Sequence, residues 1–226
     1  IASGYYEFKG FDAGPVFSIF GYNEVEGLRL RLGGRTYFGQ NDPWRIEGFG
    51  AYGFKDQKFK YGLSGKVLVS KKNRKILFGG YRKDIEQTGA SLTNSKDVLG
   101  RNRASSGLIT VGANDRLTSI ELTTLGYQME PAKNFVFRVL GSHRTLKSAS
   151  ETFSLSYYDE NGNVKNSIKQ SELELGINFT PGRKTSGYGV ERRVINSGDF
   201  PSFFLGYTFG LEDVLQSDFD YHRIQA

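Results

Sequence analysis

Alternation of apolar and polar residues with a period of two is the feature that most constrains this fold. Residues 28–32 read Leu-Arg-Leu-Arg-Leu, and similar alternation runs through 59–69, 172–179 and 202–209. Successive side chains of a strand point to opposite faces, so each segment is expected to form a strand with one apolar and one polar face. Apolar residues at helical spacing are nearly absent, and the sequence therefore predicts an all-β protein.

The pattern predicts about eleven strands in an antiparallel, up-and-down order. Many of them are about ten residues or longer, whereas strands of soluble proteins mostly have about five or six residues. This length suits a tilted transmembrane strand of about 9–11 residues. We therefore expect part of a transmembrane β-barrel, with the whole of 1–226 as one barrel region of a longer chain. The predicted strands are 15–22, 25–37, 44–54, 59–70, 75–86, 117–129, 135–146, 151–158, 167–179, 202–211 and 219–226.

Composition excludes several other classes. The chain has no Cys, which removes disulfide frameworks, thiol nucleophiles and thiolate metal sites. It has 18 Phe and 13 Tyr against 5 Pro, which argues against disorder. No run of about 18 apolar residues occurs, so no transmembrane helix is expected, but a β-barrel carries no such run.

The polar faces of the strands indicate what a barrel of this kind would enclose. Charged residues on these faces are expected to line a wet lumen, and the cations among them to favour anions. The candidate lumen residues are Arg29, Arg31, Lys60, Lys66, Glu172 and Glu174. Their apolar neighbours should touch lipid, and the aromatic residues near strand ends, at 37–44 and 52–61, suit the bilayer interface.

Two long polar connections, 87–116 and 180–201, stand out among short turns. With strands numbered as above they follow the fifth and ninth strands, which places both at one end of the sheet. Transmembrane barrels have short periplasmic turns and longer outer loops, so both segments are expected outside the membrane. Their basic residues are candidates for contact with a partner or ligand: Arg101, Arg103, Arg116, Arg183, Lys184, Arg192 and Arg193.

Three segments of the chain look familiar: GPVFSIFGYNEVEGLRLRLGGRT (14–36), EGFGAYGFKDQKFKYG (47–62) and SDFDYHRIQ (217–225). Together they resemble the barrel of large Bacteroidota outer-membrane proteins of unassigned function that carry an N-terminal carboxypeptidase-regulatory-like domain. More distantly, the paired hairpins are similar to the surface-antigen barrels that assemble outer-membrane proteins. The resemblance implies an outer-membrane location and no catalytic residues.

Local motifs for cofactors and nucleic acid are weak. Gly48, Gly50 and Gly53 match a dinucleotide fingerprint in spacing, but they lie inside a predicted strand with no helix after it. The segment 159–163 lacks the Gly and Glu spacing of a calcium loop and suits a hairpin turn. The basic cluster at 71–75 suits a turn near anionic headgroups, so no nucleic-acid partner, cofactor or metal is expected.

The sequence therefore predicts a non-enzymatic outer-membrane barrel that acts in envelope transport, or as a scaffold in a transport or assembly complex. Its expected partners are outer-membrane lipid or lipopolysaccharide and other outer-membrane proteins or lipoproteins. One alternative is a hydrolase with a site at the barrel rim, in which His143 meets Ser154 or Ser156, or His222 meets Asp218 or Asp220. A second alternative is a soluble ligand-binding barrel, whose apolar face would turn inward.

Overall fold

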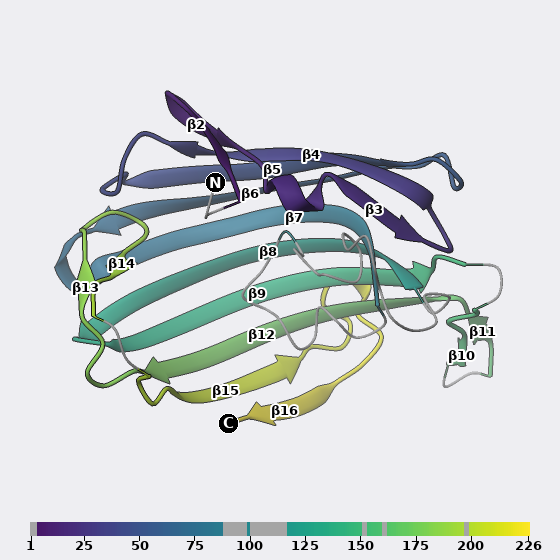
Figure 1. Ribbon diagram of the computed structural model, residues 1–226. Coiled ribbons are helices and arrows are strands. Elements are labelled where there is room, and N and C mark those ends of the chain that lie inside the picture. The colour runs from purple at the N-terminus through teal and green to yellow at the C-terminus, as the bar shows by residue number, and fades with distance from the viewer. Residues whose placement is uncertain (1–3, 88–98, 100–116, 151–152, 160–161, 197–198) are drawn as a thin grey trace.

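The computed structural model describes residues 4–87, 99, 117–150, 153–159, 162–196 and 199–226. One large, curved antiparallel sheet of 12 strands dominates this part of the chain (Figure 1). Its strands are β1 (Tyr6–Phe8), β2 (Gly10–Ala13), β3 (Phe20–Asn23), β4 (Gly27–Tyr37), β5 (Trp44–Gly53), β6 (Phe59–Ser70), β7 (Lys75–Gln87), β8 (Leu117–Ala132), β9 (Phe135–Ser148), β12 (Ser167–Phe179), β15 (Phe203–Gly210) and β16 (Tyr221–Gln225).

The sheet follows the chain from β4 to β16, with β2 and β1 continuing beyond β4 and β3 also paired to β4. The expectation of an all-β, antiparallel, up-and-down fold is confirmed. The sheet does not close into a barrel, because β1 and β16 lie at its two edges. Two small hairpins lie outside it: β10 (Tyr157–Tyr158) with β11 (Val164–Lys165), and β13 (Thr185–Ser186) with β14 (Arg193–Val194).

Helical structure in the described residues is limited to three short 3-10 turns: η1 (Val16–Ser18), η2 (Lys72–Arg74) and η3 (Val214–Gln216). No described helix has the length and apolar character needed to cross a bilayer.

Two strand predictions were wrong. The segment 15–22 divides into η1 and the short β3, and β1 and β2 before it were not predicted. The segment 151–158 contributes no strand to the large sheet, because β9 pairs directly with β12 from Ser167↔Lys147 to Phe179↔Phe135. Leu155 of this segment instead packs against the buried cluster of Ile120, Leu122 and Leu146.

This correction changes the placement of the two long connections. Three antiparallel steps, from β7 through β8 and β9 to β12, separate the points where these connections leave the sheet. Gln87 pairs with Leu117 at one end of the sheet, whereas Phe179 pairs with Phe135 at the other. We call these the Gln87 end and the Phe179 end. The expectation that both long connections share one end was therefore wrong.

Contacts across the sheet establish which face is concave. Arg29 on β4 and Asp84 on β7 meet at 2.7 Å although β5 and β6 lie between their strands. Three strand spacings of about 4.8 Å would separate these side chains by more than their combined reach on a flat sheet. The face that carries Arg29 and Asp84 is therefore the concave one.

Burial on the two faces is the reverse of that in a soluble sheet protein. Concave-face charges such as Arg29, Arg82 and Asp84 are at most 2% exposed, whereas the convex-face side chains of Leu32 and Leu125 are 63% and 70% exposed. Alternation within each strand produces this segregation, since neighbouring residues take opposite faces. Buried apolar residues on this side of the sheet include two small clusters, Phe49–Ala51–Leu99 and Ile120–Leu122–Leu146.

Close backbone approach at Gly34 gives a test of this arrangement. A Cβ at Gly34 would lie 2.7 Å from the carbonyl oxygen of Asp12 on β2 and would also overlap the ring of Phe11. A Cβ at Gly65, on the same face of β6, would meet its nearest neighbour at 3.9 Å. We expect Gly34→Ala to lower the free energy of unfolding by about 1–3 kcal/mol and Gly65→Ala to change it little, as measured by urea denaturation. Equal effects of the two substitutions would contradict the β2–β4 pairing.

Candidate functional site

The concave face carries the charged residues that the sequence selected as lumen candidates. Arg29, Arg31, Lys60, Glu172 and Glu174 are all buried there, and Lys66 is half-buried. Each comes from a strand in which the intervening residues face outward, so the alternation alone positions them. Arg31 stacks over the ring of Phe49 at 3.8 Å, a cation–π contact.

The concave face of the curved sheet forms a trough. A bridging segment, residues 181–196, crosses the Phe179 end of this trough. It leaves β12 and reaches the β4–β5 turn, where the Val190 amide donates to the carbonyl of Asp42 at 2.8 Å and the Tyr188 amide donates to Asn41 at 2.9 Å. Arg74 of the β6–β7 turn donates to the carbonyls of Gly189 (3.0 Å) and Val190 (2.8 Å). The segment is thus tied to strands far from its own in the sheet.

Glu191 is the electrostatic anchor of the bridging segment. Its carboxylate pairs with Lys66 at 3.2 Å and with Arg45 in a shorter contact. Burial alone would raise the pKa of the Glu191 carboxyl, but Lys66 and Arg45 outweigh that effect and hold the pKa below its ordinary value. The ion pairs therefore favour docking of the segment at neutral pH, and this contribution is lost as the pH falls through the lowered pKa.

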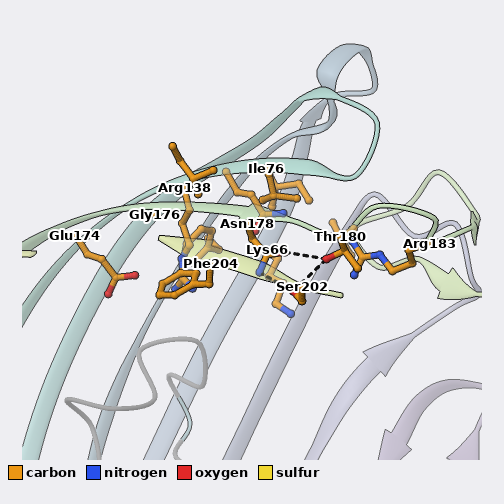
Figure 2. Close-up of a pocket in the computed structure, with 15 residues that line it drawn as sticks. Lys66, Ile76, Arg138, Glu174, Gly176, Asn178, Thr180, Arg183, Ser202 and Phe204 are labelled. Carbon is orange, nitrogen blue, oxygen red and sulfur yellow. Dashed lines mark hydrogen bonds between the residues drawn. The ribbon is translucent and has the colours of Figure 1, made fainter. Parts of the chain in front are cut away.

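A cavity of about 410 Å³ lies beside this segment on the concave face (Figure 2). Lys66, Arg138 and Arg183 line it together with one carboxylate, that of Glu174. On one side of it the Thr180 hydroxyl lies 3.1 Å from the Asn178 side-chain oxygen and 3.2 Å from the Ser202 hydroxyl. Apolar side chains complete the lining: Ile76, Phe78, Val136 and Phe204.

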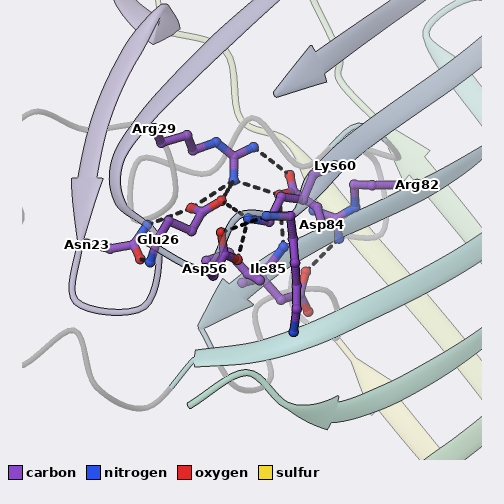
Figure 3. A network of polar contacts seen from close by, with 10 residues as sticks. Asn23, Glu26, Arg29, Asp56, Lys60, Arg82, Asp84 and Ile85 are labelled. Atoms are coloured by element: carbon purple, nitrogen blue, oxygen red, sulfur yellow. Dashed lines mark hydrogen bonds and ion pairs between the residues drawn. The ribbon is translucent and has the colours of Figure 1, made fainter. Parts of the chain in front are cut away.

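A second charged cluster occupies the Gln87 end of the trough (Figure 3). Arg29 is its centre and donates to Glu26 at 3.1 Å and to Asp84 at 2.7 Å. Lys60 contacts both Glu26 and Asp56 at 2.6 Å. Arg82 and Glu86 add a neighbouring ion pair at 2.5 Å. Buried charges require such partners, because an isolated charge in a low-dielectric site is costly.

Charge pairing at this end cancels the positive charge that the sequence indicated. Among the described residues, the cluster contains three cations, Arg29, Lys60 and Arg82. Four carboxylates face them: Glu26, Asp56, Asp84 and Glu86. Arg29 and Lys60 consequently give this part of the trough no surplus positive charge to attract anions, contrary to the expectation drawn from these two residues.

Glu172 is the centre of a third group on the concave face. It pairs with Arg144 on β9 and accepts hydrogen bonds from Ser142 (3.3 Å) and from the Tyr221 hydroxyl. Arg223 on β16 lies 3.8 Å away. The group thus links β9 and β12 to β16, with β15 between β12 and β16 in the sheet.

The candidate partner residues have different positions. Arg101, Arg103 and Arg116 lie outside the described residues. The remaining four belong to the bridging segment at the Phe179 end, where Arg192 pairs with Glu130 at 2.8 Å. Arg183 is half-buried, and Lys184 and Arg193 are exposed.

The histidines take partners other than those proposed for a hydrolase. His143 Nδ1 lies 2.9 Å from the Ser171 hydroxyl, which itself donates to the carbonyl of Val214 at 2.6 Å. His222 Nδ1 lies 2.9 Å from the Tyr207 hydroxyl. Because the Ser171 proton is directed to a carbonyl and not to the imidazole, this pair lacks the nucleophile–base geometry of a hydrolase. Among described residues, no group of three or more His, Asp or Glu side chains is arranged to hold a metal ion.

Sequence reasoning missed the partners of the lumen candidates. Glu26, Asp84 and Glu191 were not selected, although Arg82, Asp84 and Glu86 show the same period-two spacing that singled out Arg29 and Arg31. That spacing was the available signal for the concave face of β7. For Glu191 no local pattern exists, because its partner Arg45 is 146 residues away.

Comparison with known proteins adds no assignment: no family model, no curated protein and no solved structure matches this chain.

The buried Arg29 network can be tested against an exposed ion pair on the opposite face. Arg29→Met leaves Glu26 and Asp84 buried without their shared cation, and we expect it to lower the free energy of unfolding by about 3–5 kcal/mol. Lys83→Met is the matched control, because Lys83 pairs with Glu121 at 2.7 Å with both side chains about half exposed. Its expected cost is below about 1 kcal/mol. Similar costs in urea denaturation would show that the Arg29 network is not buried in the folded protein.

Proposed function

We propose that this sheet is part of the wall of a bacterial outer-membrane β-barrel, with its convex face against lipid and its concave face against water. The observation that supports this most is the reversed burial of the two faces. A soluble protein rarely exposes a continuous apolar patch of this kind, whereas a membrane barrel requires one. The second alternative, a soluble ligand-binding barrel, needs its apolar face inside, and the segregation of Leu32 and Leu125 from Arg29 and Asp84 opposes it.

Aromatic residues bound the apolar convex band at both ends. Phe38 and Trp44 lie 5.6 Å apart near the Phe179 end, and Tyr52 and Phe54 lie 5.4 Å apart near the Gln87 end. Trp44 and Tyr52 are eight residues apart on β5, or about 26 Å along an extended strand. At the strand tilt of about 35–45° found in outer-membrane barrels, this length spans about 20 Å along the membrane normal, somewhat less than their apolar band of about 25 Å with interfacial aromatic rings at its edges.

Toward the Gln87 end, β7, β8 and β9 carry polar residues on both faces. The convex side there carries the Lys83–Glu121 ion pair and the exposed Lys147, while Arg82 and Asp84 face inward. Strands that are polar on both faces suit water and not lipid. In this proposal the Gln87 end projects outward, where barrels carry their longer loops, and the bridging segment lies at the periplasmic mouth.

The sheet edges at β1 and β16 determine what else the barrel needs. An exposed edge in the bilayer would leave backbone groups unpaired, so closure requires further strands. In this proposal they come from elsewhere in a longer chain. The resemblance of 14–36 and 47–62 to Bacteroidota outer-membrane barrels supports the same interpretation.

The biochemical role that follows is passage of solutes or support of partner proteins, without catalysis. A charged, water-facing trough suits solute movement through the envelope, or a scaffold for partners in transport or outer-membrane assembly. Outer-membrane lipid or lipopolysaccharide covers the convex face in this account, and other outer-membrane proteins or lipoproteins are the expected protein partners. The Ser171–His143 geometry gives the rim-site hydrolase alternative no specific support.

Adjacent residues on β6 give a sharp test of which face meets lipid. Leu63 is 60% exposed on the convex face and pairs with Gly48, midway between Trp44 and Tyr52. Leu63→Arg should cost about 2–4 kcal/mol and reduce the folded yield, measured as the form that migrates differently before and after boiling in detergent. Ser64→Arg is the control, since Ser64 faces the trough opposite Glu47. A larger loss for Ser64→Arg, or recovery of the parent protein from the soluble fraction, would refute the proposal.

A further inference from the structure

The cavity at the Phe179 end differs from the Gln87 end in its charge balance. Of the cations that line it, Lys66 shares Glu191 with Arg45, and Arg138 lies close enough to Glu174 to interact with it. Arg183 has no carboxylate partner among the described residues, and its buried Nε has no hydrogen-bond partner there. A half-buried guanidinium of this kind leaves the cavity with surplus positive charge.

The remainder of the lining combines polar and apolar groups. Thr180, Asn178 and Ser202 present hydroxyl and amide groups on one side, as Figure 2 shows. Phe204 on β15 pairs directly with Asn178, and Phe78 on β7, whose ring Arg138 overlies at 4.8 Å, supplies the rest of the aromatic lining. Small-molecule sites characteristically combine an apolar wall with a few convergent polar groups, in a volume of about 300–1,000 Å³.

We propose that this cavity binds a small organic anion, with its carboxylate or phosphate held by Arg183 and Lys66 and its apolar body against Phe78 and Phe204. A guanidinium holds either head group through charge-assisted, often bidentate hydrogen bonds. The apolar wall selects against inorganic phosphate, which has no body to fill it. The site lies on the concave face, so the inference does not depend on lipid contact with the convex face.

The test uses the purified protein and two probes of one shape. Naphthoate supplies the carboxylate with an aromatic body, and naphthalenemethanol supplies the same body without charge. Isothermal titration calorimetry should show saturable binding of naphthoate and binding of the alcohol weaker by about tenfold or more. Naphthyl phosphate, run beside them, distinguishes a preference for phosphate from one for carboxylate.

Two adjacent residues of the bridging segment provide the matched variants. Arg183→Gln should weaken naphthoate by about tenfold or more, because it removes the unpaired guanidinium. Lys184→Gln removes a charge one residue away on an exposed side chain and should leave the affinity unchanged. Both variants are compared only after each gives the parent's circular dichroism spectrum and urea unfolding midpoint.

A third variant blocks the cavity without altering charge. A Cβ at Gly176 would meet Glu174 and Phe204 at 3.7 Å, an ordinary contact, so Gly176→Val can add volume inside the cavity with little backbone strain. It should abolish naphthoate binding. Equal affinity for the alcohol, full affinity in Arg183→Gln or Gly176→Val, or no binding of naphthoate or naphthyl phosphate to the parent protein would overturn the inference.

Discussion

The ion pair between Arg29 and Asp84 is the interaction on which the architecture depends. It joins β4 and β7 across two intervening strands, so it exists only where the sheet is strongly curved. Both groups are buried, and each would be costly without the other. Curvature and charge pairing therefore stabilise one another, and together they fix which face of every strand looks inward. The apolar residues are left on the convex face by the same alternation.

The two ends of the trough differ in how completely their buried charges are paired. At the Gln87 end, four described carboxylates face three described cations, and the Asn23 amide donates to Glu26 at 2.7 Å. At the Phe179 end, Glu191 pairs with both Arg45 and Lys66, while Arg183 has no carboxylate partner in the part of the chain that the structure describes. A cluster in which every cation has a carboxylate partner suits a structural role, whereas a cluster with a surplus cation suits recognition of an anion. The segment that supplies Arg183 and Glu191 also covers that end.

The sequence predicts the long strands well because their alternation is local. β4 to β9, β12 and β15 all follow from period-two patterns within three residues of their ends. The segment 151–158 was mistaken for a strand of the sheet because its apolar residues alternate. Leu155 in this segment packs against Ile120 and does not belong to a strand of the sheet. That one error moved a long connection to the wrong end, since each strand reverses direction. The site was harder to predict than the strands. The sequence indicated Arg29 and Lys60, but their partners lie up to 55 residues away along the chain, and only the folded sheet brings them together.

The central claim is that the convex face meets lipid, and Trp44 reports on it directly. It is the single Trp of the chain, 39% exposed beside Phe38 at the edge of the apolar band. The measurement is quenching of its fluorescence in vesicles of phospholipid brominated either near the headgroup end or near the tail end of the acyl chains. The account predicts strong quenching by shallow bromine and weaker quenching by deep bromine. Quenching by aqueous iodide with no effect of either brominated lipid would contradict it.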